Sequence, residues 1–323
     1  MLIYILALEG VFDLGLAALL DVIGTANELA PIAQPSLRFD ARLVGVRASA
    51  RTAHGLTVPV EPADGLPRPD LVLLPALGSK TPAALVAALA RADVADAGLC
   101  LKRWAGQGAA VGAACTGTFV LAESGLLDGQ SATTSWWLSA LFRQRYPRVT
   151  LDDSRMLVNS SRFTTAGAAL AHLDLALGVV RGQSPALAAL CARYLLIEAR
   201  QSQAQFVIPD HVAHADPVVE RFERWARDRL ASGFSLADAA LAVGASERTL
   251  GRRVQAVLGK SPLAYFQRLR VERAAHLLRT GADSIERIAN LVGYADGATL
   301  RTLLRRELGK GVRELRGRES GRH

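Results

Sequence analysis

Hydrophobic and polar residues follow two different patterns along the chain. Up to about residue 180, short runs of aliphatic residues alternate with longer segments in which apolar residues recur every three to four positions. The short runs predict strands and the longer segments predict helices. Strands that alternate with helices are typical of an α/β domain with a mostly parallel sheet. We therefore predict such a domain over residues 1–183, with helices on both faces of the sheet.

This first pattern gives approximate limits for each element. The predicted strands are at residues 1–8, 37–46, 70–75, 109–115, 131–134, 156–159 and 162–165. The predicted helices are at residues 12–29, 81–91, 99–106 and 168–180. A further helix, capped by Ser184 and opened by Pro185, runs to about Arg200. With the segment up to residue 216 it forms the predicted connection, residues 184–216, to a second domain at residues 217–323.

The second pattern is helical throughout and occurs twice. Ser235 and Ser284 each begin a helical segment that ends at a glycine, and these glycines, Gly244 and Gly293, are 49 positions apart. In the first copy, Ser235 and Asp238 have the spacing of a capping box, and Ser246 caps a second helix directly after the glycine. Two capped helices joined by so short a turn form a helix-turn-helix. We predict such motifs at residues 235–256 and 284–306; a helical hairpin used only for packing is the alternative.

The spacing of the two copies suits duplex DNA. Ser261 and Pro262 begin a segment without a helix breaker up to Arg279, which predicts a helix roughly 27 Å long at ~1.5 Å per residue. Adjacent major-groove segments on one side of DNA are ~34 Å apart. One chain could therefore place two helices in neighbouring grooves.

The charge distribution supports the same partner. The chain has a net charge of +8, and residues 217–323 hold 21 of its 38 Lys and Arg but only 12 of its 30 Asp and Glu. The remaining residues are close to neutral. A basic excess confined to the repeat-bearing domain is expected where a protein neutralises a phosphate backbone. Double-stranded DNA is therefore the predicted macromolecular partner.

The second domain resembles the DNA-binding domain of the AraC/XylS family of transcription regulators. The matching residues are 244–253, 258–265, 269–278 and 288–296. The resemblance implies that the second helix of each motif contacts bases, through Arg248, Gly251 and Arg252 in one motif and Gly297, Ala298, Thr299 and Thr302 in the other. Arginine bonds guanine in a bidentate way, so the first motif is expected to supply sequence discrimination. Phosphate contacts are expected from Arg301, Arg305 and Arg306, and Arg253 is a further candidate for DNA binding.

A cysteine marks the candidate chemistry of the first domain. Cys115 follows a strand of small residues and directly precedes a helix. Ligands of such domains bind beyond the carboxyl ends of the strands, and a helix N-terminus lowers a thiol pKa. A structural cysteine in the core is the alternative.

The first domain resembles the ThiJ/PfpI group of the class I glutamine amidotransferase-like superfamily, and the whole chain resembles the GlxA-like regulators. The matching residues are 74–75, 113–117, 121–129, 132–136, 146–147 and 165–167. The resemblance implies a flavodoxin-like fold. Enzymes of this group place a histidine where this chain has Ser135, and a glutamate where it offers only Asp13. A serine hydroxyl is no general base near neutral pH, so we predict a non-catalytic sensor of a small metabolite.

The expected ligand pocket contains Asn27, Cys115, Thr116, Ser135 and Trp136, together with the loop after Pro75. Trp136 and Trp137 could form an aromatic wall for a cationic metabolite, or could belong to the core. His172, on an otherwise apolar helix, is expected to be a core or edge histidine. Two other functions stay open: a Cys115-dependent hydrolase or glyoxalase tethered to DNA, and an architectural DNA binder that responds to no metabolite.

Several classes of protein are disfavoured. The cysteines Cys100, Cys115 and Cys191 lack metal-ligand spacing, and His211 with His214 lacks a fourth ligand, so neither a metal nor a cofactor is predicted. No secretion signal and no apolar run of the ~18 residues that span a membrane is recognised. We predict a cytoplasmic homodimer, with RNA polymerase as a further candidate partner.

Overall fold

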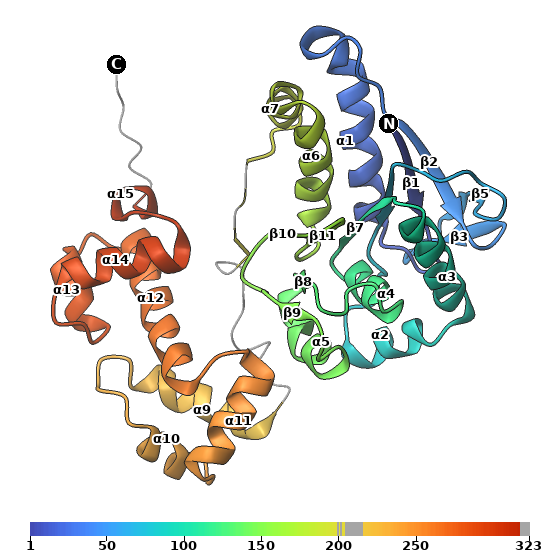
Figure 1. Ribbon diagram of the computed structural model, residues 1–323. Coiled ribbons are helices and arrows are strands. Elements are labelled where there is room, and N and C mark those ends of the chain that lie inside the picture. Colours follow the sequence, from blue (N-terminus) through green and yellow to red (C-terminus); the bar gives the residue numbers. More distant parts are fainter. Residues whose placement is uncertain (199, 201, 204–215, 317–323) are drawn as a thin grey trace. The chain divides into compact units, whose positions relative to one another are not determined.

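The computed structural model describes residues 1–198, 200, 202–203 and 216–316, in two compact units, residues 1–203 and 204–323 (Figure 1). The pair His211 and His214 lies outside the described residues. The first unit also includes the segment from residue 184 to residue 203, which was predicted to be part of the connection. That segment begins with helix α7, Pro185–Tyr194, which packs on helices α1 and α6 of the first unit.

The first unit is built on a seven-stranded sheet in the order β10-β11-β7-β6-β1-β2-β5. All neighbours in this sheet pair in parallel except β10 and β11, which are antiparallel. The strands are β1 Leu2–Leu6, β2 Asp40–Gly45, β5 Glu61–Pro62, β6 Leu71–Leu74, β7 Ala110–Ala114, β10 Leu157–Ser160 and β11 Phe163–Ala166. Counting the long parallel strands along the chain, the order is 2-1-3-4-5, as in flavodoxin-like folds. The predicted fold class is confirmed.

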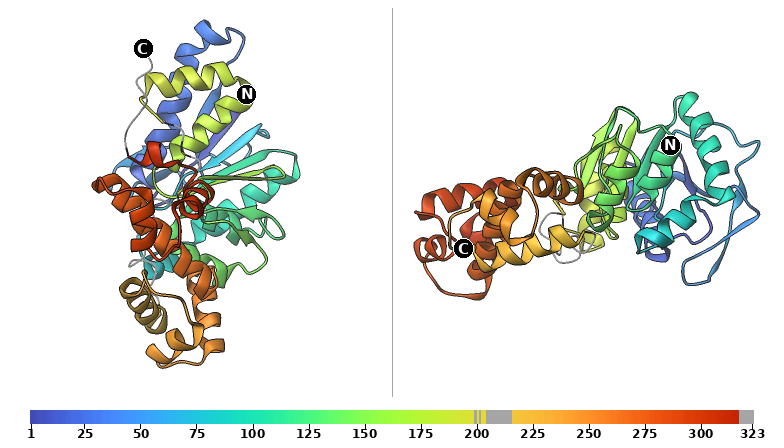
Figure 2. Two further views of the ribbon diagram at one scale, coloured as in Figure 1. Left: turned by 90° about the vertical axis from the view of Figure 1, so that its left-hand side faces the viewer. Right: turned by 90° about the horizontal axis from the view of Figure 1, so that it is seen from below.

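Helices cover both faces of the sheet, as Figure 2 shows from two further directions. One face packs against α1, α6 and α7, and the other against α2, α3, α4 and α5. The helices are α1 Asp13–Ala33, α2 Pro82–Leu89, α3 Ala92–Gly106, α4 Gly117–Glu123, α5 Ser139–Arg145 and α6 Ala171–Gln183.

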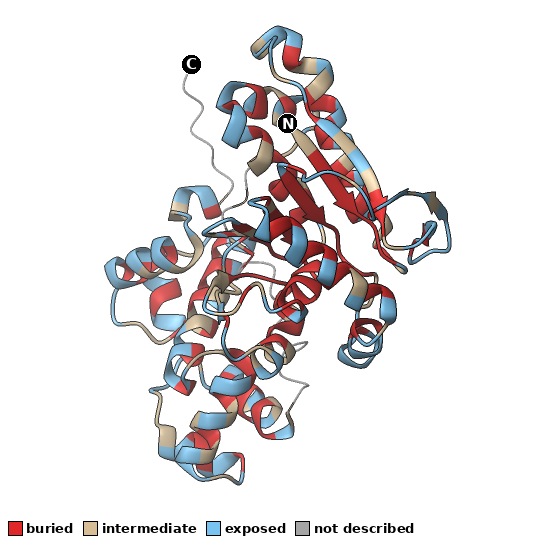
Figure 3. Cartoon of the chain, turned by 45° about the vertical axis from the view of Figure 1, so that its right-hand side comes forward, coloured by how far each residue is buried: buried red, intermediate tan, exposed pale blue. Residues whose placement is uncertain are grey.

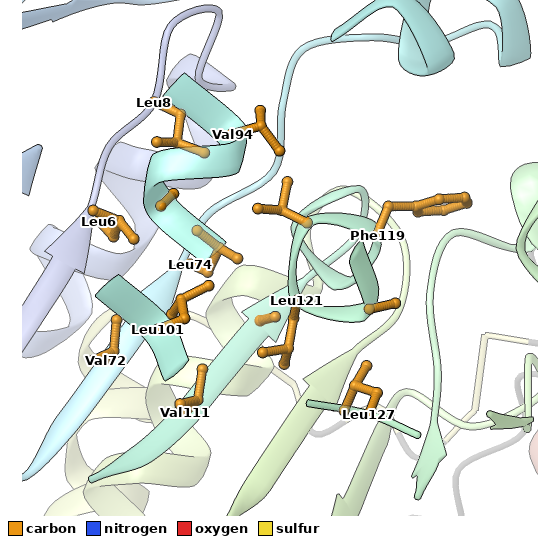
Figure 4. Packing of buried hydrophobic residues seen from close by; sticks show 14 of the residues in the cluster. Leu6, Leu8, Val72, Leu74, Val94, Leu101, Val111, Phe119, Leu121 and Leu127 are labelled. Carbon is orange, nitrogen blue, oxygen red and sulfur yellow. The ribbon is translucent and has the colours of Figure 1, made fainter. Parts of the chain in front are cut away.

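The alternation of side chains within each strand produces the two cores. In β1, Ile3 and Ile5 point to the α1 side, whereas Tyr4 and Leu6 point to the α3 side. Figure 4 shows the second of these cores, where β6, β7, α3 and α4 converge. The central strands β1, β6, β7 and β11 are buried almost throughout, as expected of a parallel sheet that is covered on both faces, whereas strands near the sheet edges such as β2 are partly exposed (Figure 3).

Several predicted limits need correction. Helix α1 runs past Leu29 to Ala33 with Pro31 inside it, and α3 begins at Ala92 rather than Leu99. Helix α7 ends at Tyr194, before the predicted Arg200, and Leu196 then takes a left-handed conformation with φ 54°. The predicted strand at residues 131–134 is present but shorter, as β8 Ser131–Ala132. The elements that were not predicted are also short: β3 Ser49–Arg51, β4 Thr57–Pro59, β5, β9 Thr150–Leu151, the 3-10 helix Trp136–Leu138 and α5.

Helix α1 is the one described helix that is long and apolar enough to cross a membrane by length and composition, with a mean hydropathy of 1.3. This corrects the prediction that no apolar segment approaches that length. Its residues Leu16, Leu19, Val22 and Ile23 are buried in the core. Packing of this kind is typical of the core helix of an α/β domain.

The second unit is all helical. Its helices are α9 Pro217–Asp228, α10 Leu236–Ala242, α11 Glu247–Leu258, α12 Pro262–Thr280, α13 Ile285–Leu291, α14 Gly297–Leu308 and α15 Val312–Leu315. Aromatic side chains from α9 and α12, with Phe234 between them, form the core of the first motif; the Phe234 and Phe266 rings are 5.1 Å apart. The core of the second motif lies among α12, α13, α14 and α15. The predicted long helix and both motifs are confirmed.

Candidate ligand site and nucleic-acid interface

Cys115 occupies a sharp turn between β7 and α4. Its backbone is left-handed, with φ 56°, and its N–H donates to the carbonyl of Ala166 at 3.0 Å. At Gly117 the chain passes so close to the end of β6 that an added Cβ would lie 2.6 Å from the Leu74 carbonyl oxygen. The glycine is therefore required for this close approach. The turn places Cys115 at the carboxyl edge of the sheet, as predicted.

The Cys115 thiol is enclosed rather than activated. Its Sγ lies 2.8 Å from Oγ of Ser135, and Cys115 is only 5% exposed. Burial raises the pKa of this thiol. The expectation that the helix N-terminus lowers it is therefore wrong, because the loss of water around a thiolate outweighs a short helix.

His172 lies close to this edge but is held by backbone groups. Its Nε2 accepts a hydrogen bond from Ala76 N–H at 3.1 Å, so Nδ1 carries the proton and donates it to the Ala169 carbonyl. The residue is 0% exposed, and burial lowers the pKa of His172 to about 4. Both ring nitrogens are thus engaged, as expected of a core histidine. Asp13 instead faces His54, with 2.8 Å between Oδ2 and Nδ1.

Four of the five predicted ligand-binding residues lie together. Thr116 donates from Oγ1 to the Leu77 carbonyl at 2.7 Å, beside Cys115 and its neighbour Ser135. Trp136 follows Ser135, and it is 8% exposed and packs edge-on against Trp137. Burial of Trp136 favours the core alternative over an open aromatic wall.

Asn27 does not join this group. Its side-chain amide exchanges two hydrogen bonds of 2.8 Å with the backbone of Phe39. Phe39 precedes Asp40, which pairs with Leu2 at the beginning of β1. Because α1 runs back along the strands, its second half lies at the amino edge of the sheet, opposite Cys115. Asn27 therefore does not lie in the pocket that was predicted around Cys115.

Gln203 is a residue of this region that the sequence analysis missed. Its side chain is 1% exposed and contacts Thr133, Thr134 and Ala168, which border the Cys115 turn. Nothing in the surrounding polar sequence distinguishes it from its neighbours. The surface also has a cavity of about 410 Å³, but it lies elsewhere; its lining residues are Ala122, Glu123, Gly125, Asp128, Arg145, Tyr146, Pro147 and Arg148.

In the second unit, both turns form as predicted. Gly244 and Gly293 have φ values of +66° and +82°, which favour glycine. Ser246 Oγ accepts from Thr249 N–H at 3.2 Å to cap α11, and an Asp296 oxygen caps α14 from 2.7 Å. The second helix of each motif is thereby fixed at its N-terminus.

The exposed side of α11 carries two arginines that are one helical turn apart. Arg248 and Arg252 are exposed, and neither makes a hydrogen bond or ion pair with any of the described residues. Gly251, between them, is half-buried. Arg253 points elsewhere and pairs at 3.2 Å with Asp216, the cap of α9. We refer to Arg248 and Arg252 as the exposed arginine pair.

The corresponding face of α14 carries small side chains, and their hydroxyl groups are bonded within the helix or to its cap. Ala298, Thr299 and Thr302 are exposed, with Thr299 bonded to its own cap and Thr302 to the backbone. Gly297 is buried, contrary to prediction, because α14 begins against α13. This helix has three exposed arginines. Arg301 pairs with Glu286 at 2.9 Å, and Arg306 pairs with Glu307 at 3.0 Å. Arg305 has no partner among the described residues.

Arg270 on α12 joins the two motifs and was not predicted. Its guanidinium carbon lies 4.7 Å from the Phe266 ring centre and 5.4 Å from that of Tyr294. Its Nε donates to the Leu230 carbonyl at 2.8 Å, and it fills the space beside Gly293. Arg270 therefore links the loop after α9 to the turn of the second motif. An arginine four residues after Phe266, on the buried face of a helix, was the available signal.

Comparisons with known proteins give the same two parts. Residues 239–318 match a family described as a helix-turn-helix domain. The chain is 30% identical over 242 residues to the HTH-type transcriptional regulator ArgR of Pseudomonas aeruginosa, a match that covers 73% of each chain. It is 29% identical over 198 residues to the HTH-type transcriptional regulator GbdR of the same species. That match covers 60% of this chain but only 54% of GbdR, so it spans about half of that relative.

A solved structure resembles the first unit. It is a THiJ/PfpI family protein from Pseudomonas syringae, with a TM-score of 0.52 and 19% identity, covering 66% of this chain and 83% of that one. At this level of identity the likeness shows the fold alone.

Proposed function

We propose that this chain, which belongs to the AraC family of helix-turn-helix transcription regulators, is a GlxA-like fusion with a ThiJ/PfpI-type domain and binds promoter DNA in response to a small metabolite. The observation that carries the proposal is the exposed arginine pair on α11, within a motif that α12 links to a second one. Unpartnered guanidinium groups on a motif helix suit bidentate contacts with guanine.

The two motifs have different roles in this proposal. The exposed arginine pair supplies sequence discrimination, and Thr299 with Thr302 adds contacts from α14. Arg301, Arg305 and Arg306 contact phosphates, which position the protein without specifying sequence. Arg253 acts within the fold, since its ion pair with Asp216 holds α11 against the start of α9.

The first unit serves as a sensor rather than an enzyme. Two observations support this part: the Cys115 thiol faces the Ser135 hydroxyl, and the nearby His172 has both ring nitrogens bonded to backbone. Neither Ser135 nor His172 supplies a general base to the thiol. The effector is expected to bind near Cys115, Thr116 and Ser135. A homodimer, contact with RNA polymerase and a cytoplasmic location remain predictions.

Selection of duplexes from a random library by the full-length protein tests the DNA-binding part. We expect two conserved blocks of bases whose centres are about one helical turn apart. Affinity should fall by at least about 40-fold between 50 and 200 mM salt, because three phosphate contacts release counterions with a slope of about 0.9 each. An architectural binder would show the salt dependence but would enrich no sequence, and that outcome would contradict the proposal.

A thermal-shift screen of amines, amino acids and aldehydes on the full-length protein tests the sensor part. A ligand at about 100 times its Kd stabilises the native state by about 2.7 kcal/mol and raises the melting temperature. The same ligand should give a smaller shift with Ser135→Ala and with Cys115→Ala. A ligand that shifts all three proteins equally binds at another site.

A further inference from the structure

The chain leaves the first unit along a short segment that is bonded to it at several points. We call Arg200, Ser202 and Gln203 the exit strap. Arg200 pairs with Asp174 of α6 at 2.5 Å. The Ser202 hydroxyl and the Gln203 N–H both donate to the Ser154 carbonyl, at 2.7 and 2.9 Å. The exit strap is therefore part of the first unit, and the second unit begins directly after it.

The side chain of Gln203 is held in a buried polar site. Its Oε1 accepts from Ala168 N–H at 3.0 Å, and its Nε2 donates to Thr133 Oγ1 at 3.1 Å and to the Thr134 carbonyl at 2.9 Å. It also lies against Gly167, where an added Cβ would be 2.5 Å from Oε1. Each polar atom of the carboxamide is thus bonded. Its removal would leave buried partners without a hydrogen bond, which is unfavourable.

The site of Gln203 and the turn at Cys115 share two segments of chain. Thr134, which accepts from Gln203, donates from Oγ1 to the Cys115 carbonyl at 2.7 Å. The next residue, Ser135, contacts the thiol. On the other side, Ala166 accepts from Cys115 N–H just before Gly167. A ligand that displaces either segment at Cys115 must therefore disturb the hydrogen bonds of Gln203.

We propose that Gln203 is a latch that couples the site at Cys115 to the chain leading into the DNA-binding unit. The bonded latch holds the exit strap on the first unit. Displacement of Thr134 or Gly167 by an effector releases it and changes how the second unit binds DNA. This inference rests on the proposed function. Because coupling between two sites is reciprocal, bound DNA must also change the accessibility of Cys115.

Alkylation of Cys115 in the full-length protein tests the latch without knowledge of the effector. The probe is iodoacetamide, applied with and without saturating duplex from the selection experiment, and each cysteine is quantified by mass spectrometry of its peptide. Cys100 and Cys191, which are also buried, serve as internal controls. In the wild type, DNA should change the rate at Cys115 by about 5-fold, at the low end of typical coupling between sites.

Two different substitutions should abolish this response. Gln203→Ala removes the carboxamide. Gly167→Ala keeps glutamine at position 203 but adds a Cβ that displaces its carboxamide. In both variants Cys115 should react about 10-fold faster, on the order of one lost buried hydrogen bond, and DNA should no longer alter the rate. The matched controls are Gln144→Ala, an exposed glutamine, and Gly182→Ala, which has open space around it. Both should behave as wild type.

The alkylation rates can overturn either the latch or the proposed function. A DNA response that persists in both variants, or none in a wild type that binds its duplex, overturns the latch. If Gln203→Ala fails to fold by circular dichroism, Gln203→Glu, which keeps the side-chain length but loses two donated bonds, replaces it. If the wild type selects no duplex, the proposed function fails. The alkylation rates of Cys115 without DNA then still test whether the Gln203 side chain restrains the turn at Cys115. Equal rates in the wild type and the variants would show that it does not, and would overturn the latch.

Discussion

Replacement of both Arg248 and Arg252 by alanine is expected to abolish preference for the selected duplex over random DNA. Each bidentate contact with guanine contributes about 1–3 kcal/mol of discrimination, so loss of both predicts a decrease of at least about 30-fold in the specificity ratio. The fold should survive, because neither side chain contacts any of the described residues through a hydrogen bond or ion pair. Fluorescence anisotropy with the selected duplex and a scrambled duplex measures the ratio.

The matched control is the double substitution Arg301→Ala with Arg305→Ala on α14. If these residues contact phosphates, affinity should fall equally for both duplexes, and the salt dependence should weaken by about one unit of slope per residue. The specificity ratio should not change. Should the control lose discrimination while the exposed arginine pair proves neutral, the roles proposed for the two motifs are reversed.

The second unit was largely predictable because its signals are local. Serine or aspartate caps, helical spacing and glycines at helix ends act within one or two turns of chain, and the structure shows Gly244 and Gly293 in left-handed conformations. Gly297 and Arg270 were not predictable in this way. Whether Gly297 is buried depends on how α14 begins against α13, and Arg270 bonds to the loop residue Leu230, 40 positions away.

The first unit was predictable in its layers but not in its site. Aliphatic runs and helical spacing give the strands and helices, whereas the two-residue strands β5 and β9 leave no periodic signal. The Gln203 side chain bonds to Thr133 across 70 positions of sequence, so only the folded chain brings them together. The placement of Asn27 in the pocket was not predictable for a related reason, because its position along α1 puts it at the amino edge of the sheet.

The pKa of the Cys115 thiol shows how magnitudes decide between two effects. A helix N-terminus stabilises an anion by typically 0.3–1 kcal/mol, and the helix after Cys115 has only 7 residues. Full burial can raise the pKa of a thiol by several units, at about 1.4 kcal/mol per unit. The sequence shows the helix but not the depth of the side chain. Desolvation therefore dominates, and the thiol is suited to sensing by contact rather than by nucleophilic attack.

Acid is expected to destabilise the first unit through His172. Burial lowers the pKa of His172 from 6.5 to about 4, so below pH 6.5 the unfolded chain binds a proton that the folded chain does not. The stabilisation is complete above pH 6.5, is lost as the pH falls towards 4, and changes no further below that. At about 1.4 kcal/mol per pKa unit, the free energy of unfolding should fall by about 3 kcal/mol.

His172→Gln isolates this contribution, because a glutamine amide can accept from Ala76 and donate to Ala169 without titrating. Asp174, whose pKa is raised by burial, titrates in both proteins, so only the difference between them reports on His172. Urea denaturation in a Trp225→Phe background follows the first unit alone, since the other tryptophans all lie there. Parallel curves of stability against pH for the two proteins between pH 4 and pH 7 would show that His172 titrates alike in the folded and unfolded chains. That result would contradict its assignment as a neutral, doubly bonded core residue.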